Sequence, residues 1–355
     1  MDPSSRKAPA LFLAIVKPLL EWYSVSARQL PWRTDRPDPY HVLVSEIMLQ
    51  QTRVETVRPY YTRFIAELPD FRTLAEAPEG QLLKLWEGLG YYSRARNLQK
   101  TAQAVMERHG GTLPADTGLL LKLPGIGEYT AGAIASIAFG LPEPAVDGNV
   151  LRVCARLLDC HADVFDPAFR SGVRNSLRKV YPKDSASEFT QSIMDLGATV
   201  CLPGSPRCDI CPLAALCLGF RSGEAPALPV RKKTPARRVE RKTVFLLRSA
   251  QGRTALRKRP ETGILAGLWE YPSETGFLTP AQIRSWLKSH GLAAEKIGEA
   301  GRKKHVFTHL EWDMQAKEIL CREENGEFTW ASEDELKNVY TLPGAFRKFD
   351  SEPGK

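Results

Sequence analysis

The chain of 355 residues is long enough for two domains of ordinary size, and its 43% hydrophobic and 25% charged residues are typical of a folded protein. Its formal net charge of +8 at pH 7 fits a polyanionic partner such as nucleic acid, although surplus lysine and arginine also solvate ordinary surfaces. No apolar run looks long enough to cross a bilayer, and seven cysteines are too few in this length for a disulfide framework.

The first 220 residues predict a succession of helices. Lys17 and Pro18 interrupt the first apolar stretch and no small-residue cleavage site follows, so we expect a first helix and not a signal peptide. Asp38 and Pro39 suit the N-cap and first position of a helix through DPYHVLVSEIMLQQT. Three more helical patterns follow in chain order: PEGQLLKLWEGLG, YSRARNLQKTAQAVMERHGG and NVLRVCARLLD.

A glutamate, Glu46, stands in the apolar run YHVLVSEIMLQQ. At helical spacing it shares a face with Val42 and Leu49, and burial there would raise its pKa enough to hold a proton near neutrality. It is either a catalytic acid or a structural glutamate bonded to a tyrosine or a backbone amide. Because buried glutamates are rare, the pattern favours a functional role.

Two glycine-containing turns share one pattern. LPGIGEYTAG (123–132) places Gly125 and Gly127 before a helix, where backbone amides could hold a phosphate. WEGLGYYS (86–93) repeats the pattern 37 residues earlier, which indicates one helix–turn–helix device used twice and not a solenoid. Since most Gly-x-Gly turns only end helices, the motif alone is weak evidence for phosphate binding.

An aspartate, Asp147, precedes a helix in AVDGNVLRV and is either a plain N-cap or a catalytic carboxylate. Helix amides would stabilise its anion and lower its pKa, whereas burial would raise the pKa of Glu46. Two carboxyl groups with separated pKa values supply an acid and an anion, which is the arrangement that cleavage of a glycosidic bond needs.

Four cysteines cluster in CLPGSPRCDICPLAALC, with the spacing C-x6-C-x2-C-x5-C: Cys201, Cys208, Cys211 and Cys217. Zinc would accept four thiolates, but one compact loop of this spacing suits a 4Fe–4S cluster better. The other cysteines are scattered and are expected in the core: Cys154, Cys160 and Cys321.

The composition changes at residues 221–242, which are rich in Pro, Ala, Lys and Arg and predict a basic linker after a helical domain at 1–220. Strand patterns then follow in TVFLLRS, TALRKR and EFTWAS, with a helix in TPAQIRSWLKSHG. They predict a separate α+β domain at 243–346 and a tail at 347–355.

These motifs resemble the endonuclease III-like superfamily of helix-hairpin-helix DNA glycosylases. Within it, SEIMLQQT, LPGIGEYTAGAIAS, VDGNVLRV and FTQSIMDLGATVC are similar to the MutY family of adenine DNA glycosylases, over nearly the whole chain. The resemblance implies a mostly α helix-hairpin-helix domain with an iron–sulfur loop, followed by an α+β NUDIX-like domain. It also implies a cytoplasmic, nucleoid-associated bacterial monomer with no membrane partner.

The implied activity is removal of adenine opposite 8-oxoguanine or guanine in duplex DNA. The resemblance gives Glu46 the role of protonating adenine and Asp147 that of stabilising the oxocarbenium-like sugar, with or without a covalent intermediate. Tyr129 would lie near the acid and the sugar, and Asn149 would orient the aspartate. Strand-cutting members of the superfamily carry lysine at the position of Tyr129, so we expect base removal without efficient strand cleavage.

Contacts with the DNA are also implied by the resemblance. An adenine must leave the stack before its glycosidic bond can be reached. The positions that match the adenine pocket are Trp32, Arg33 and Gln191, the last of which is glutamate in some family members. The positions that match stack-entering or lesion-contacting residues are Gln51, Thr52, Leu89, Tyr91, Phe307, Thr308 and His309. Residues of the type of Leu89 and Tyr91 are more often simply core, and HVFTHLEW could be a strand with ordinary surface residues.

Two alternatives remain open from the residues. A bifunctional lyase for oxidised pyrimidines is opposed by Tyr129 and by the C-terminal domain, while a non-enzymatic damage binder predicts loss of Glu46 or Asp147, and both are present. In the NUDIX-like domain, AQIRSWLKSHGL has Arg, Ser and Lys where a hydrolase needs glutamates for its metal. We therefore expect this domain to bind without hydrolysing a nucleotide.

Overall fold

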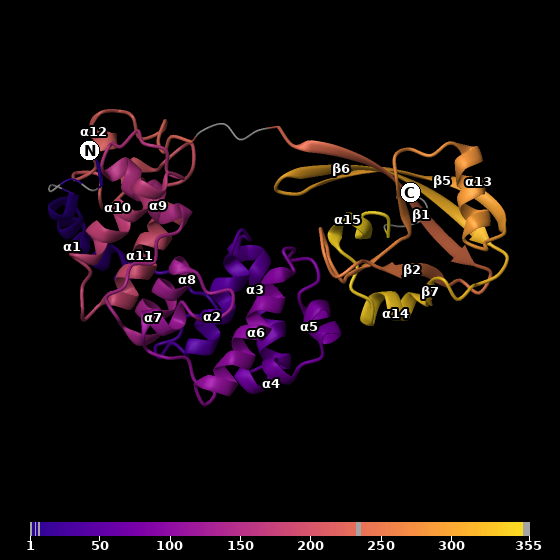
Figure 1. The fold of residues 1–355 in the computed structure, drawn as a ribbon. Coiled ribbons are helices and arrows are strands. Elements are labelled where there is room, and N and C mark those ends of the chain that lie inside the picture. The colour runs from indigo at the N-terminus through magenta and orange to yellow at the C-terminus, as the bar shows by residue number, and fades with distance from the viewer. Residues whose placement is uncertain (1, 4, 6–7, 232–235, 351–355) are drawn as a thin grey trace. The chain divides into compact units, whose positions relative to one another are not determined.

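The computed structural model describes residues 2–3, 5, 8–231 and 236–350. Contacts divide the chain into two compact units (Figure 1). The helical unit consists of Met1–Glu76 and Arg96–Lys233, and the C-terminal unit of Ala77–Ala95 and Thr234–Lys355.

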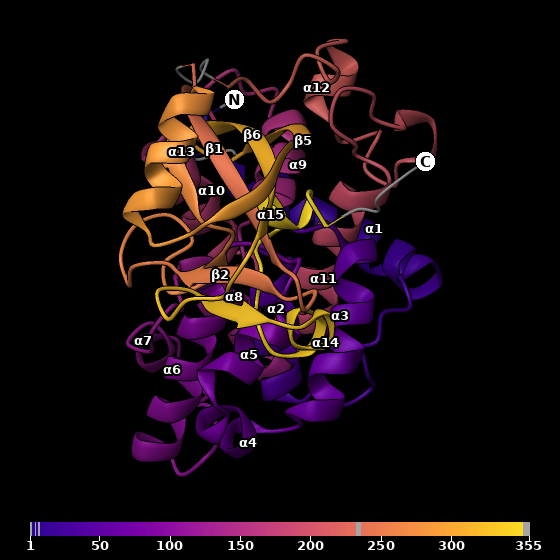
Figure 2. The same ribbon diagram turned by 90° about the vertical axis from the view of Figure 1, so that its right-hand side faces the viewer.

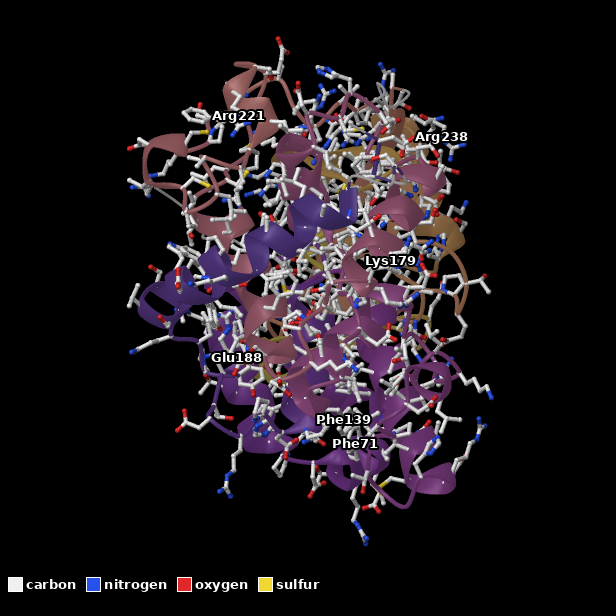
Figure 3. All side chains as sticks on the ribbon, turned by 90° about the vertical axis from the view of Figure 1, so that its left-hand side faces the viewer. Phe71, Phe139, Lys179, Glu188, Arg221 and Arg238 are labelled. Carbon is white, nitrogen blue, oxygen red and sulfur yellow. The ribbon has the colours of Figure 1, made fainter. Side chains whose placement is uncertain are left out.

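The helical unit contains no strand among its described residues, in agreement with the sequence pattern. Its elements are α1 (Ala8–Ser26), α2 (Pro39–Leu49), α3 (Val54–Glu67), α4 (Phe71–Glu76), most of α6 (Ser93–Arg108), α7 (Thr117–Leu120), α8 (Glu128–Ala133), the π-helical η1 (Ile134–Ala138), α9 (Gly148–Leu157), α10 (Pro167–Arg178), α11 (Ala186–Thr199), the 3-10 turn η2 (Cys208–Ile210) and α12 (Leu218–Arg221). Phe71 is buried, whereas Lys179, Glu188 and Arg221 are exposed (Figure 3).

The first helix differs from expectation. Pro18 lies inside α1, which runs unbroken from Ala8 to Ser26 and is long and apolar enough, by length and composition alone, to cross a membrane. The prediction that no run reaches this length was therefore wrong. Phe12, Ile15 and Leu19 recur at helical spacing and are fully buried in a core that α9 and α11 share, so this helix packs as a core element.

Side-chain caps fix the starts of the two helices that carry the predicted carboxylates. Asp38 accepts hydrogen bonds from the Tyr40 and His41 amides at the start of α2, with Pro39 at the first position as predicted. Asp147 accepts one from the Val150 amide at the start of α9. Such caps satisfy amides that the helix itself leaves unpaired, so they fix where each helix begins.

The C-terminal unit is built on a seven-stranded sheet with the order β3-β2-β1-β6-β5, in which β4 also pairs with β1 and β7 with β2. Its elements are α5 (Glu79–Leu85), β1 (Arg238–Ser249), β2 (Thr254–Lys258), β3 (Trp269–Glu270), β4 (Ser273–Thr275), α13 (Pro280–Ser289), β5 (Ala294–Val306), β6 (Leu310–Cys321), β7 (Thr329–Ala331), α14 (Glu333–Asn338) and α15 (Gly344–Arg347). β1 and β6 are parallel, from Arg238 opposite Leu310 to Ser249 opposite Cys321.

The two faces of this sheet bury different helices, because alternate residues of a strand point to opposite sides. Leu246 of β1 packs in a core with Phe346 of α15, while its neighbour Leu247 packs in a second core with Trp286 of α13. Helices therefore cover both faces, which gives the unit three layers (Figure 2).

The expected linker at 221–242 is largely folded. Ala225 and Leu228 are buried, and the Leu228 carbonyl accepts a hydrogen bond from Arg156 Nε at 2.9 Å, so this stretch packs onto the helical unit. Residues from Arg238 onward already belong to β1. The part of the predicted linker at 232–235 lies outside the described residues.

Two other expected boundaries move. The tail expected at 347–355 begins later, since Phe349 is buried, and residues 351–355 lie outside the described residues. The segment Ala77–Ala95, expected in the helical domain, groups with the C-terminal unit. Glu87 there pairs with Arg347 at 2.7 Å and accepts the Leu342 amide at 2.8 Å, so ion-pair and backbone contacts hold it.

Candidate active site

A cavity of about 370 Å³ in the helical unit, which we call the acid pocket, brings the predicted catalytic and adenine-pocket residues together. This volume is within the range of small-ligand sites. The predicted residues among its lining are Trp32, Arg33, Glu46, Thr52, Tyr129, Asp147, Asn149 and Gln191. They come from the segment before α2, from α2 itself, from the turn after it and from the starts or faces of α8, α9 and α11, so the pocket exists only in the folded chain.

Glu46 is the buried acid of this pocket. Its side chain lies on α2 and is 6% exposed, in agreement with the apolar pattern around it. Burial raises its pKa to about 7, the negative charge of Asp147 adds to the rise, and the Tyr129 hydrogen bond and the charge of Arg33 oppose it. The Tyr129 hydroxyl donates to the Glu46 carboxylate. A group with this pKa holds a proton in a large fraction of molecules at neutral pH.

Asp147 stands at the start of α9 in the same pocket. It accepts hydrogen bonds from the Val150 amide at 2.7 Å and from Asn149 Nδ2 at 2.9 Å. Burial nevertheless raises its pKa, so the expectation that helix amides would lower it was wrong. The reason is that desolvation of a nearly enclosed carboxylate outweighs the three hydrogen bonds that favour its anion.

An arginine from α9 fixes the orientation of Asn149. Arg152 donates from its Nη2 to Asn149 Oδ1 at 2.9 Å, which leaves the amide nitrogen of Asn149 facing Asp147. The same guanidinium donates from Nε to the carbonyl of Cys201 at 2.8 Å. One buried side chain thus joins Asn149, the hydrogen-bond partner of Asp147, to the cysteine loop.

The Gly-x-Gly turn precedes α8. Gly125 has φ +75°, and a side chain there would place its Cβ 2.6 Å from Asn97 Cβ, so only glycine suits the position. Gly127 has φ −93° and open space around it, so neither the backbone nor the packing requires glycine there. Glycine at this position leaves the backbone without a covering side chain. It lines a second cavity of about 780 Å³ with Gln51 and Arg174, and this cavity shares Tyr129 and Asp147 with the acid pocket.

The comparisons with known proteins agree with this geometry. The HhH-GPD superfamily base excision DNA repair protein model matches residues 44–181, and the NUDIX domain model matches residues 243–351. The adenine DNA glycosylase of Arabidopsis thaliana is 38% identical over 367 residues, which cover 91% of this chain and 55% of that protein. That of Buchnera aphidicola subsp. Baizongia pistaciae (strain Bp) is 34% identical over 299 residues, 84% of each chain. The chain belongs to the adenine DNA glycosylase family.

Solved structures support the fold of the helical part of this family member. A non-covalent endonuclease III–DNA complex matches with a TM-score of 0.52 and 27% identity, covering 61% of this chain and 97% of that chain. A thermostable thymine-DNA glycosylase matches with a TM-score of 0.55 and 27% identity, covering 61% and 99%. The protein is therefore a DNA glycosylase, with the predicted helix-hairpin-helix domain and NUDIX-like domain.

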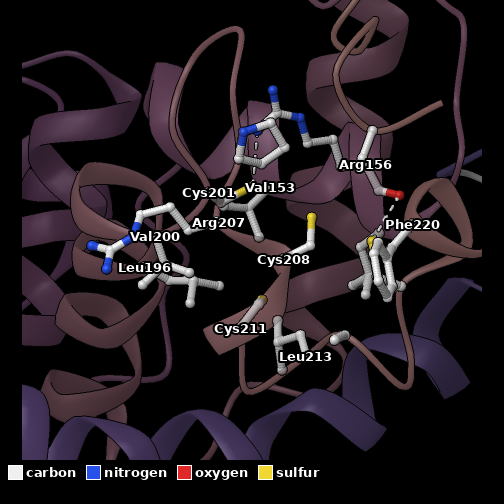
Figure 4. Close-up of a pocket in the computed structure, with 15 residues that line it drawn as sticks. Val153, Arg156, Leu196, Val200, Cys201, Arg207, Cys208, Cys211, Leu213 and Phe220 are labelled. Atoms are coloured by element: carbon white, nitrogen blue, oxygen red, sulfur yellow. Dashed lines mark hydrogen bonds between the residues drawn. The ribbon is translucent and has the colours of Figure 1, made fainter. Parts of the chain in front are cut away.

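The four predicted cysteine ligands surround one space beside α9. Cys201, Cys208, Cys211 and Cys217 line the same cavity, and in Figure 4 Cys208 and Cys211 point into it near Cys201. Within the described part of the chain, no group of three or more possible ligands is tight enough for a single ion. Arg156 donates to Cys201 Sγ at 3.2 Å, a contact that suits a thiolate. Four cysteine thiols around one space, with a guanidinium beside them, are the donor set that an iron–sulfur centre takes.

The predicted lesion-contacting loop lies in the C-terminal unit, at the turn between β5 and β6. Thr308 and His309 are exposed there. Phe307 packs edge-on against Trp312, with 4.8 Å between the two ring centroids. Tyr91 is half-exposed and its hydroxyl lies 3.1 Å from Thr308 Oγ1. Leu89 is buried in the preceding turn, so its side chain is a core contact in this state of the protein.

An ion-pair partner of Arg33 and several charged residues of the pocket lining, among them Arg28, were not predicted from the sequence. Asp195, on α11, is fully buried and binds two arginines, Arg28 and Arg33, of which only Arg33 was predicted. A signal was available, because Asp195 stands in the apolar run SIMDLGATV just as Glu46 stands in its own. Arg28 gave no comparable signal, since it lies in the polar stretch SVSARQLPWR.

Proposed function

We propose that this family member removes adenine from duplex DNA where adenine lies opposite 8-oxoguanine or guanine, by acid-assisted cleavage of the N-glycosidic bond. The observation that carries the proposal is the acid pocket, in which a buried carboxyl with a pKa near 7 faces a second carboxyl. Cleavage of a glycosidic bond needs a proton for the leaving base and a negative charge for the sugar. The similarity to the adenine DNA glycosylases of Arabidopsis thaliana and Buchnera aphidicola supports adenine as the base that is removed.

Glu46 supplies the proton in this proposal. An adenine flipped into the acid pocket meets Glu46 on α2, and a carboxyl with a pKa near 7 combines a large protonated fraction with useful acidity. Protonation turns adenine into a neutral leaving group. Trp32, Arg33 and Gln191 line the same cavity and offer an aromatic face and polar groups to a purine.

Asp147 stabilises the sugar as the bond breaks. Its carboxylate is held by the Val150 amide and by Asn149, so it cannot swing away from the position where positive charge develops. Water then adds to the sugar carbon, and the products are free adenine and an abasic site. Tyr129 stands where a lyase carries lysine, and a phenol forms no Schiff base, so the strand stays uncut.

The cysteine loop holds a 4Fe–4S cluster in this proposal, through Cys201, Cys208, Cys211 and Cys217. When bound, such a cluster would link the four thiolates of the loop through one inorganic centre. The chain's own residues carry its effect inward, since Arg152 connects the Cys201 carbonyl with Asn149. About four irons per chain after anaerobic purification, with a broad absorption near 400 nm, is the expected result, and stoichiometric zinc without iron would contradict the assignment.

The C-terminal unit recognises the base opposite adenine through Phe307, Thr308 and His309. Gln51, Thr52, Leu89 and Tyr91 enter or border the gap in the stack, and the Gly125–Gly127 turn binds the backbone phosphate. Backbone contacts position the DNA without reading its sequence, so partner choice is assigned to the exposed loop at 307–309.

The test is release of free adenine from a duplex with one A·8-oxoguanine pair, measured with enzyme in excess. The protein should yield free adenine and an abasic site without a strand break before alkali treatment. Release of an oxidised pyrimidine with strand cleavage would identify a lyase instead. DNA binding with no base released from any duplex would identify a damage binder.

A further inference from the structure

The buried carboxylate of Asp195 forms the densest ion-pair network beside the acid pocket. It lies on α11 with no exposed side-chain surface. Arg28 donates to it from Nε at 2.8 Å and from its backbone amide at 3.2 Å, and Arg33 from Nη1 at 2.7 Å and Nη2 at 2.8 Å. A two-pronged guanidinium bond of this kind fixes both distance and plane. Burial alone would raise the pKa of Asp195, but the two arginines hold it below its usual value, so the carboxylate is charged.

Arg33 connects this network with the catalytic acid. It lines the acid pocket together with Glu46, and its positive charge favours loss of the Glu46 proton. The groups that face Glu46 from the packed elements are Tyr129 on α8, Asp147 at the start of α9 and Arg33 in the segment before α2. Arg28 also lines the pocket, as do Arg53 and Glu55 on the side of α3.

We propose that Asp195 is a positioning residue for base release: it anchors Arg33 in the pocket wall and offsets part of its charge, so that Glu46 keeps its proton in neutral solution. The inference rests on the proposed function, since it assigns a partner to the same acid. Without Asp195, Arg33 would lose the two carboxylate bonds that fix its position, although Nη1 would still bond the Arg28 carbonyl at 3.2 Å, and it would face Glu46 with an uncompensated charge. Both effects draw the proton off Glu46.

The sign of the effect distinguishes this role from a structural one. Loss of the Asp195 charge lowers the pKa of Glu46, because more positive charge faces the carboxyl. Loss of the Arg33 charge raises it, because the positive charge that favours loss of the Glu46 proton is then gone. A neighbouring unit charge commonly moves a buried pKa by about one unit or more, so the two variants should differ by about two units.

The experiment is the pH dependence of adenine release between about pH 5 and 9, with enzyme in excess over A·8-oxoguanine duplex. In the wild type the rate should fall as pH rises through about 7. Asp195→Asn should move this fall to lower pH by about one unit, so that the rate is near wild type at pH 5.5 and about tenfold lower at pH 8. Arg33→Gln should move it upward, whatever its effect on the maximal rate.

Matched controls separate charge from folding. Asp195→Glu keeps the charge, so the rate of adenine release should decline at the same pH as in the wild type. Glu188→Gln makes the same charge change at an exposed position on the same helix and should leave that pH unchanged. If Asp195→Asn does not fold, as judged by circular dichroism, the double variant Arg33→Gln with Asp195→Asn can be used instead. It removes both charges, so its rate of adenine release should decline at a pH close to that of the wild type.

A fall that stays at the wild-type pH in Arg33→Gln, or an Asp195→Asn rate that is lowered equally at all pH values, would overturn the role of Asp195. The failure of the proposed function is distinguishable, because then the wild type itself would release no adenine at any pH.

Discussion

Among the residues that the structure describes, each unit buries one glutamate, and the two have different partners. Glu46 in the helical unit accepts a hydrogen bond from the neutral hydroxyl of Tyr129, and burial raises its pKa to about 7. Glu270 in the C-terminal unit is 2% exposed and binds two guanidinium groups, those of Arg257 at 3.0 Å and of Arg259. The partners decide what a buried carboxyl can do. A phenol leaves the Glu46 proton exchangeable, whereas two arginines bind both carboxylate oxygens of Glu270 and join three side chains of the C-terminal unit.

The largest effect expected from this contrast is on the rate of base release. Glu46→Gln should lower it by a factor of about 100 to 10,000, the usual contribution of a positioned acid, because an amide cannot donate this proton. DNA binding should persist. Single-turnover release of adenine is the measurement, and Glu55→Gln is the matched control, since Glu55 lines the same pocket on a largely exposed side chain. A Glu46→Gln rate within about tenfold of the wild type would mean that another group is the acid.

The same substitution should stabilise the protein at high pH. The folded state holds the Glu46 proton more tightly than the unfolded chain does. The carboxyl therefore does not lower the free energy of unfolding below about pH 4.5, and it lowers it increasingly as pH rises toward 7. Above pH 7 this cost reaches up to about 3 kcal/mol, and Glu46→Gln removes it. Denaturant unfolding at pH 5 and pH 8 tests the point. Equal free energies of unfolding for variant and wild type at pH 8 would show that Glu46 is not desolvated.

Glu270→Gln should have the opposite effect on stability and little effect on chemistry. It leaves Arg257 and Arg259 facing each other without their shared carboxylate, which should cost about 2–3 kcal/mol after allowance for the partial exposure of Arg257. Thermal unfolding of the C-terminal unit is the measurement. Glu261→Gln breaks only an exposed pair with Lys258 and should cost under about 0.5 kcal/mol, so similar losses in both variants would refute the distinction.

The contrast between the two glutamates also shows how far the sequence alone could lead. The burial of Glu46 was predictable, because nearly all its neighbours along the helix are apolar. The structure buries the side chain, and burial raises its pKa. Asp147 was found as an N-cap, but the direction of its pKa shift was predicted wrongly, since the sequence does not reveal how completely the pocket encloses it. Local hydrogen bonds can be read from a cap motif, and desolvation cannot.

Contacts between distant segments account for the other failures. The linker was expected to be extended from its composition, but Leu228 is buried and bonded to Arg156, 72 residues earlier in the chain. Segment Ala77–Ala95 reads as helical-domain sequence, yet Glu87 pairs with Arg347, 260 residues later. No periodicity or turn motif encodes such pairings. Both depend on surfaces that exist only after each unit has folded.

The smallest effect expected lies in the loop between β5 and β6, which tests whether the C-terminal unit contributes more than a stable sheet. Phe307 packs on Trp312, so its removal would disturb the fold, whereas Thr308 and His309 are exposed and can be changed alone. Thr308→Ala with His309→Ala should lower the preference for 8-oxoguanine over guanine opposite adenine by about tenfold, because contacts to one base edge are worth about 1–3 kcal/mol.

The measurement is the ratio of single-turnover rates on the two duplexes, together with the ratio of the binding constants. Adenine release from the A·G duplex should change little, since the acid pocket is untouched. Tyr91→Phe removes the hydroxyl that lies 3.1 Å from Thr308 Oγ1. The threonine side chain could then rotate, so the preference for 8-oxoguanine should fall by less than in the double alanine variant. If the ratios in the double alanine variant equal those of the wild type, the loop at 307–309 does not read the partner base, and recognition belongs to residues nearer the acid pocket, such as Gln51 and Thr52.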